Sequence, residues 1–174
     1  PFIVLEDAKI SDTLIDNAIN SAFWNGGQNC SANMRQIIHT KVKDEFLDKV
    51  LQKAKNIKVG DPLNPETNMG SMISKKHLST VDNYIQKGID EGASLLLGGV
   101  SEKNQKGFFA KPTLFDNLKE NMTIAQEEIF GPVLGILTVN NMEEALKIAS
   151  SSKYGLHASV FTQDINKAFH IAKS

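Results

Sequence analysis

The sequence holds one cysteine, Cys30, within the stretch FWNGGQNCSANMR from Phe23 to Arg35. Glycines before a cysteine let the backbone approach a ligand, and a turn can direct several peptide N–H groups at one point. A thiolate there can attack a carbonyl carbon while backbone N–H groups, including its own, stabilise the oxyanion. A helix beginning near Ser31 would favour the thiolate further. Free cysteines are also among the residues most often buried, so the residues alone leave nucleophile and core filler equally open.

A second candidate is the stretch EEIFGPV, Glu127–Val133, which leads directly into an apolar run. A carboxylate at a strand end can accept hydrogen bonds from both hydroxyls of a ribose, and an aromatic ring can pack against a planar base. The alternative is that the two acids are solvated and that Phe130 fills the core. Taken alone, the stretch favours this alternative.

Other residues and the composition exclude several classes of function. The four histidines (His39, His77, His157 and His170) do not stand at triad or metal-ligand spacing from the cysteine, and we interpret them as surface or core residues. A lone cysteine predicts no internal disulfide and no zinc site. The 19 Lys and Arg residues balance 20 Asp and Glu residues, and no apolar run could cross a bilayer. We therefore expect a cytoplasmic protein that binds neither nucleic acid nor membrane.

Strand and helix patterns alternate along the chain and must position the two stretches. Short apolar or β-branched runs predict strands at residues 2–5, 35–40, 94–97, 114–115, 133–139 and 158–162. Apolar residues at helical spacing predict helices from Ser11 or Asp12 to the Asn25-Gly26-Gly27 turn, from Asp44 to Gly60, and over residues 78–89, 142–150 and 165–172. Loops are predicted at 61–71 and from Gly98 to Lys106. This order predicts a single α/β domain over residues 1–174, with a mainly parallel twisted sheet and helices on both faces.

The two stretches together resemble the aldehyde dehydrogenase superfamily. Its cysteine signature, F-x-N-x-G-Q-x-C, is matched by Phe23, Asn25, Gly27, Gln28 and Cys30, with a downstream arginine matched by Arg35. Its E-E-I-F-G-P-V box is matched at every position from Glu127 to Val133. Weaker family features follow in the same order, namely GDP at 60–62, EGA…GG at 91–99, KPT at 111–113 and YGL at 154–156. The resemblance covers essentially the whole chain and is specific, because two independent motifs occur in the right order.

The resemblance implies that Cys30 is the nucleophile of an NAD(P)-dependent aldehyde dehydrogenase, which oxidises a small aldehyde to a carboxylic acid through a thiohemiacetal and a thioester. The Cys30 N–H would form half of the oxyanion hole. By the same match, Glu128 would bind the nicotinamide ribose and Phe130 would pack near the nicotinamide. Candidates for the aldehyde channel flank the cysteine, and they are Phe23, Trp24, Asn29 and Ser31. Trp24 is equally suited to the core at a helix end.

The resemblance also implies that the chain is a fragment, most of a catalytic domain. The family's general-base glutamate stands in an E-L-G-G-K motif just before the strand matched by residues 2–5. The N-terminal cofactor domain, the second oxyanion donor and the C-terminal oligomerising arm would also be absent, so we expect little or no NAD-dependent turnover from these 174 residues alone. The choice between NAD and NADP would be made in the absent domain. The full-length protein is expected to be a homodimer or homotetramer.

Two other functions are compatible with the residues. The same thiol and oxyanion donor could hydrolyse activated esters without a cofactor, as a thiol esterase. The chain could also be a non-catalytic structural domain that retains the fold. A requirement for NAD(P)+ would separate the first alternative from a dehydrogenase. An alkylation rate of Cys30 no faster than that of a free thiol would favour the second.

Overall fold

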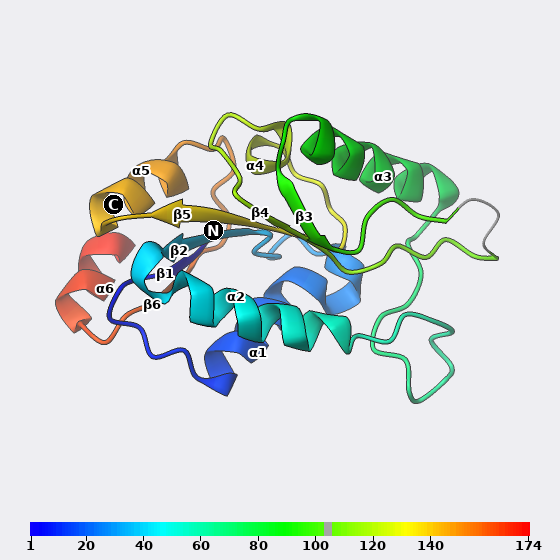
Figure 1. Ribbon diagram of the computed structural model, residues 1–174, viewed down its shortest axis with the longest axis horizontal. Helices are drawn as coiled ribbons and strands as arrows, with labels where there is room; N and C mark the ends of the chain where they lie inside the picture. The colour runs from blue at the N-terminus through cyan, green and yellow to red at the C-terminus, as the bar shows by residue number, and fades with distance from the viewer. Residues whose placement is uncertain (103–105) are drawn as a thin grey trace.

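The computed structural model describes residues 1–102 and 106–174, which form an α/β domain on one sheet of order β3-β4-β5-β2-β1-β6 (Figure 1). The strands are β1 (Phe2–Val4), β2 (Arg35–His39), β3 (Ser94–Leu97), β4 (Thr113–Asp116), β5 (Val133–Val139) and β6 (Ser159–Phe161). Neighbouring strands run parallel except at the edge, where β3 is antiparallel to β4. The predicted mainly parallel sheet is therefore confirmed. The loop predicted up to Lys106 falls partly on residues 103–105, which lie outside the described residues.

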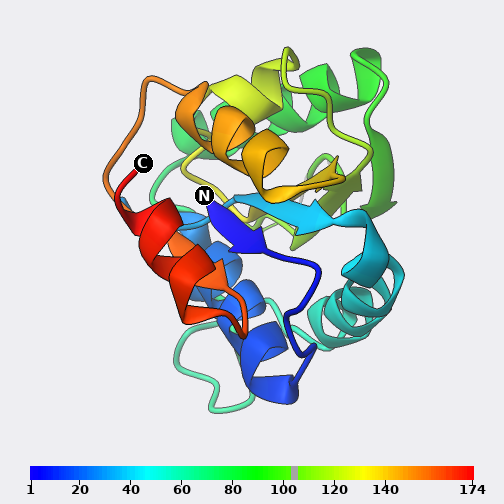
Figure 2. The same ribbon diagram turned by 90° about the vertical axis from the view of Figure 1, so that its left-hand side faces the viewer.

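Helices cover both faces of this sheet (Figures 1 and 2). One face carries α3 (Lys75–Asp90), α4 (Thr123–Gln126) and α5 (Met142–Ser150), and the other carries α1 (Asp12–Phe23) and α2 (Thr40–Lys55). The last helix, α6 (Ile165–Ala172), follows the edge strand β6. Each face has its own apolar cluster, and β5 contributes Leu137 to one and Ile136 to the other. Burial on both faces explains why β5 reads as a continuous apolar run.

The helix α1 forms where its apolar spacing predicts, and it delivers the chain to Cys30. Ser11 caps it, because its Oγ accepts a hydrogen bond from the Leu14 N–H at 3.3 Å. The apolar residues at helical spacing in this segment are all buried, namely Leu14, Ile15, Ala18, Ile19, Ala22 and Phe23. After the helix, the short turn η1 (Trp24–Gly27) has positive φ at Asn25, Gly26 and Gly27. A left-handed backbone cannot continue an α-helix, so the chain turns here toward the cysteine.

The structure corrects the sequence prediction at three places. The helix α2 begins at Thr40, ahead of Asp44, because His39 Nδ1 accepts a hydrogen bond from the Lys41 N–H at 3.1 Å and caps the helix. It also ends at Lys55, before Gly60. The helix α4 was not predicted, because four residues do not show a helical period. Residues 28–34 form a loop with a turn at Cys30 and Ser31, so no helix begins near Ser31 to favour a thiolate.

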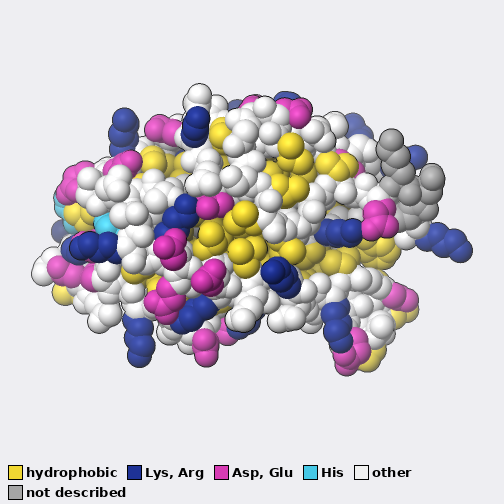
Figure 3. Space-filling model, viewed as in Figure 1, with side chains coloured by type: hydrophobic (Ala, Val, Ile, Leu, Met, Phe, Trp, Pro, Cys, Tyr) yellow, Lys and Arg dark blue, Asp and Glu magenta, His cyan; other side chains and the backbone are white. Residues whose placement is uncertain are grey.

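Charges of both signs are interspersed over the face shown in Figure 3. Hydrophobic side chains also reach the surface there, and on the edge strand β3 Leu95 and Leu96 are 38% and 39% exposed. The mixture agrees with the formal net charge of −1 for the chain.

Candidate active site

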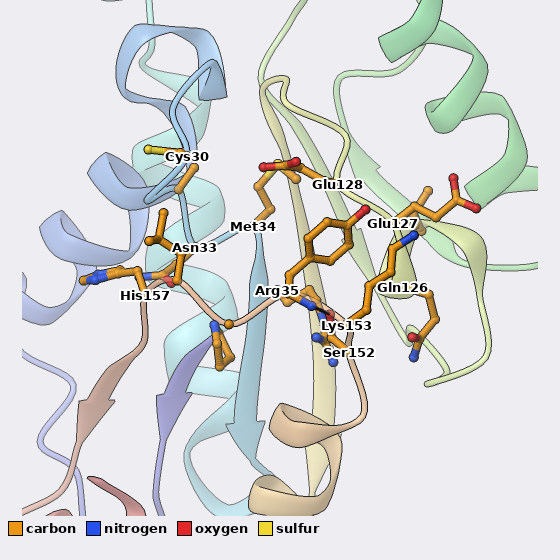
Figure 4. Close-up of a pocket in the computed structure, with 16 residues that line it drawn as sticks. Cys30, Asn33, Met34, Arg35, Gln126, Glu127, Glu128, Ser152, Lys153 and His157 are labelled. Carbon is orange, nitrogen blue, oxygen red and sulfur yellow. Dashed lines mark hydrogen bonds between the residues drawn. The ribbon is translucent and has the colours of Figure 1, made fainter.

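The candidate site lies where the loops that enter four parallel strands meet, at the amino-terminal edge of the sheet. β5, β2, β1 and β6 are consecutive neighbours that run in the same direction, so their entry loops lie side by side. A hollow of about 360 Å³ is lined by residues from all four loops (Figure 4). Its lining includes the chemically capable residues Cys30, Arg35, Glu127, Glu128, Tyr154 and His157.

Cys30 is exposed at this hollow, and so it is not a core residue. Its nearest described polar partner is Asn29 Oδ1, 3.9 Å from Sγ. The same Oδ1 accepts hydrogen bonds from the Ser31 N–H at 3.3 Å and the Ser31 hydroxyl at 3.2 Å. Within the described residues, the N–H groups of Ser31 and Ala32 bond to Asn29 in the turn, whereas no acceptor engages the Cys30 N–H. The thiol and one peptide donor are therefore both available to a ligand.

The cysteine loop is tied into the fold by two side chains, Gln28 and Asn33. Gln28 Oε1 accepts a hydrogen bond from the Ile73 N–H at 2.9 Å, which links the loop to the segment before α3. Asn33 is buried, and its Nδ2 donates to Ser159 Oγ on β6 at 3.0 Å, while its backbone N–H donates to the Ser21 carbonyl of α1 at 2.9 Å. The turn around Cys30 is thus fixed from both sides.

The two sequence motifs touch each other through a pair of glycines. Gly27 has φ +69°, and a Cβ at this position would lie 2.2 Å from the Gly131 carbonyl oxygen and 2.5 Å from its carbonyl carbon. Both contacts are with backbone atoms, which cannot move aside as the end of a side chain can. Only glycine allows this approach with this φ. The contact brings the loop that carries Cys30 against the loop that carries Glu128.

The side chains of the Glu127–Val133 box lie in different surroundings. Ile129 is buried, whereas Glu127, Glu128 and Phe130 are exposed. The alternative in which Phe130 fills the core is therefore wrong. Glu128 lies at the same end of the hollow as Cys30, although Figure 4 shows that Sγ does not point at its carboxylate. Phe130 instead borders a separate hollow, together with Gln28 on the far side of the cysteine loop.

Arg35, at the start of β2, lines the hollow together with Pro1. Its Nη2 donates to the Ile148 carbonyl of α5 at 2.7 Å, while its Nε is buried without a partner among the described residues. Burial lowers the pKa of the Arg35 guanidinium, and Glu120 partly opposes this shift. The guanidinium keeps its positive charge at physiological pH, because arginine is not deprotonated in proteins. It therefore places a fixed positive charge beside the hollow.

The four residues predicted to line an aldehyde channel do not share the hollow of Cys30. Trp24, Asn29 and Ser31 line an adjoining hollow of about 330 Å³, which meets the first at Asn33 and His157. Trp24 is 65% exposed, so it does not fill the core at the end of α1. Phe23 is buried in the apolar cluster of α1. Of the three residues at this hollow, Trp24 is exposed, whereas Asn29 and Ser31 are half-buried.

The histidines occupy different parts of the fold. His39 is buried at the end of β2 opposite Arg35, and its Nε2 donates to the Asn140 carbonyl at 2.8 Å. His157 is one of the residues that line the hollow, and the half-buried His77 contacts the backbone of Phe130. In residues 1–102 and 106–174, no group of three or more His, Cys, Asp or Glu side chains could hold a metal ion. No helix in these ranges is long and apolar enough to cross a membrane.

The fold and the site define a class of protein: an α/β domain that presents a thiol on a glycine turn next to carboxylates. The model of the aldehyde dehydrogenase family matches residues 1–174. The chain is 44% identical to the α-ketoglutaric semialdehyde dehydrogenase of Bacillus subtilis, and the match covers 96% of this chain and 35% of that protein.

Solved structures show the same fold. An NAD-dependent aldehyde dehydrogenase from Sinorhizobium meliloti superposes with a TM-score of 0.95 at 36% identity, covering 99% of this chain and 34% of the other. The aldehyde dehydrogenase of Bacillus cereus in its NAD+ complex gives 0.94 at 41% identity, covering 99% and 35%. The chain therefore belongs to the aldehyde dehydrogenase family. It spans only 35% of the length of the Bacillus subtilis relative.

Proposed function

We propose that this chain supplies the thiol of an NAD(P)-dependent aldehyde dehydrogenase, with Cys30 as the nucleophile. The observation that carries the proposal is the exposed Cys30, which shares one hollow with Glu128 and has an unused backbone N–H. Family membership supports the reaction class. The Bacillus subtilis relative is named for a semialdehyde substrate, and the Bacillus cereus relative was solved with NAD+, which supports a small aldehyde and a nicotinamide cofactor.

The proposed reaction begins when the Cys30 thiolate adds to the carbonyl carbon of the aldehyde. The new C–S bond places negative charge on the former carbonyl oxygen, and the Cys30 N–H donates a hydrogen bond to it. Bound at the site, NAD(P)+ supplies the hydride acceptor that converts the resulting thiohemiacetal into a thioester. Water then attacks the thioester carbonyl, the C–S bond breaks, and the acid leaves while the thiol is restored. The base that activates this water is expected in the part of the full-length protein that precedes Pro1.

The residues of the hollow fit a ribose. Glu128 is exposed, and its carboxylate has no hydrogen-bond partner among the described residues, so both oxygens are free to accept from vicinal hydroxyls. Phe130 is 36% exposed and offers an aromatic face, although it borders the neighbouring hollow. We therefore keep Glu128 as the ribose-binding residue and Phe130 as the proposed nicotinamide contact. A Phe130→Ala variant of the full-length protein should bind the reduced cofactor more weakly, and unchanged binding would remove Phe130 from the site.

The test of the function uses the full-length protein with NAD+ or NADP+ and a series of small aldehydes, followed by formation of the reduced cofactor. Cys30→Ser should lower kcat by at least about a thousandfold, since the nucleophile is lost. Ser79→Ala, which removes an exposed hydroxyl of α3, is the control and should leave kcat unchanged. Retained oxidation in Cys30→Ser would contradict the proposal. Hydrolysis of an activated ester without any NAD(P)+-dependent oxidation would instead identify a thiol esterase, and neither activity would identify a non-catalytic domain.

The aldehyde channel and the assembly are further parts of the proposal. Trp24, Asn29 and Ser31 border the hollow next to that of Cys30, and this supports a role for them in contacting a substrate side chain. Trp24→Ala should change the ratio of kcat/KM between a short and a long aldehyde by about tenfold, and an unchanged ratio would exclude Trp24. We expect the full-length protein to act in the cytoplasm as a homodimer or homotetramer. Its mass in solution, measured by light scattering, tests this state directly.

A further inference from the structure

One face of α3 runs along the Glu127–Val133 box. His77, Val81 and Tyr84 stand four and three residues apart, a spacing that places all three on the same side of a helix. At its first position, His77 Nε2 lies 2.7 Å from the Phe130 carbonyl oxygen. A carbonyl only accepts, so Nε2 carries the hydrogen and donates it. The two rings also meet edge to face, with centroids 6.2 Å apart.

The other two positions of this face contact the neighbours of Phe130. Val81 packs so closely on Gly131 that a Cβ there would lie 2.5 Å from Val81 Cγ2. The Tyr84 hydroxyl donates to Glu127 Oε2 at 2.8 Å. The first ten residues of the helix thus contact the box at Phe130, Gly131 and Glu127.

This arrangement separates the two adjacent acids. Glu127 is held by Tyr84, whereas Glu128 has no partner among the described residues. In Figure 4, Glu127 points toward the α3 side, and Glu128 lies at the Cys30 end of the hollow. Phe130, on the other side of Glu128, has φ +55°, a strained conformation for a residue other than glycine. Such a conformation persists when surrounding contacts fix it, and the hydrogen bond from His77 is one such contact.

We propose that His77 and Tyr84 are positioning residues that orient the cofactor-binding box, so that Glu128 is directed into the hollow of Cys30. Tyr84 fixes the acid before Glu128, and His77 fixes the carbonyl of Phe130 after it. Neither residue contacts the reacting atoms, and both act through the backbone that carries Glu128. This inference rests on the proposed role of Glu128 in binding the ribose of NAD(P)+.

The test measures KM for NAD(P)+, kcat, and the dissociation constant of the reduced cofactor in the full-length protein. Tyr84→Phe and His77→Leu should each raise KM for the cofactor by about three- to tenfold, the effect of losing one hydrogen bond, with kcat within about twofold. His77→Gln retains an N–H donor and should recover most of the loss. If Tyr84 acts through Glu127, then Tyr84→Phe combined with Glu127→Gln should be no worse than Glu127→Gln alone.

Matched controls and a reference variant separate this inference from the function that it extends. Ser79→Ala and Thr80→Val remove hydroxyls of α3 that bond only to the helix's own carbonyls, and they should change neither constant. Glu128→Gln should raise KM for the cofactor more than either positioning variant. The inference is wrong, and the function stands, if only Glu128→Gln raises KM for the cofactor. The same holds if the positioning variants change KM and kcat together with the melting temperature. If Glu128→Gln leaves KM unchanged, the cofactor role of Glu128 fails and the inference fails with it.

Discussion

The contact between Gly27 and Gly131 yields a prediction whose size follows from the structure. In Gly27→Ala the new Cβ would lie 2.2 Å from the Gly131 carbonyl oxygen, and the residue would have to keep φ +69° or move. The left-handed conformation costs about 1–2 kcal/mol for alanine. Forcing a methyl group into a packed contact costs a further ~1–3 kcal/mol. We therefore expect Gly27→Ala to lower the free energy of unfolding by roughly 2–5 kcal/mol, a large part of the usual 5–15 kcal/mol.

Substitutions at two other glycines separate the destabilisation caused by backbone strain from that caused by the close contact. Gly92 has φ +89° with nothing within 4 Å of the position that a methyl group would take, so Gly92→Ala should show the conformational cost alone. Gly155 lacks both the positive φ and the near contact, so Gly155→Ala should stay within about 0.5 kcal/mol of the parent. The assay is urea unfolding of the 174-residue chain followed by circular dichroism. A Gly27→Ala variant no less stable than Gly92→Ala would refute the tight contact between the two motifs.

Three further predictions concern ionisation and activity. The hydrogen bond to Glu127 raises the pKa of Tyr84 to about 12, so the protonated hydroxyl stabilises the fold below about pH 10 and this stabilisation is lost as pH rises toward 12. In Glu127→Gln, the pKa of Tyr84 measured by absorbance titration should return toward its ordinary value. The hydrogen bond from Lys167 lowers the pKa of Glu6, so this pair stabilises the fold above the ordinary pKa of 4.5, and the stabilisation is lost as pH falls through the lowered value. The loss of stability in Lys167→Met should therefore shrink on acidification, and a loss that does not change with pH would show that the pair is not its cause. The isolated chain, given an aldehyde and NAD+, should form no measurable NADH although Cys30 is present, and clear NADH formation would show that the chain contains a complete site.

The elements of the fold were predictable because their patterns are local. Ser11 as a cap and the helical spacing from Leu14 to Phe23 were enough to predict α1, and the apolar run from Val133 to Val139 was enough for β5. The start of α2 was not predictable from acids alone, because His39 caps that helix with its ring. The antiparallel direction of β3 depends on long-range pairing that no local pattern encodes.

The site was predictable only in its motifs. Cys30 and Glu128 were proposed from the two motifs and their resemblance to a family, and both residues line one hollow. Tyr154 and His157 were not predicted as site residues, because their place depends on which strand entries are neighbours in the sheet. One signal was available: each of these residues lies just before a predicted parallel strand, and such entry loops gather at one edge of the sheet.

The most direct test of the central claim is to find the acyl group on Cys30 during turnover. The full-length protein would be mixed with an aldehyde and NAD(P)+, quenched in acid and digested, and the peptide that contains Cys30 would be analysed by mass spectrometry. We predict a mass increase equal to the aldehyde less two hydrogen atoms, which appears only when NAD(P)+ is present and is absent from Cys30→Ser. Continued oxidation of the aldehyde with the acyl group on another residue, or with Cys30→Ser still active, would contradict the account.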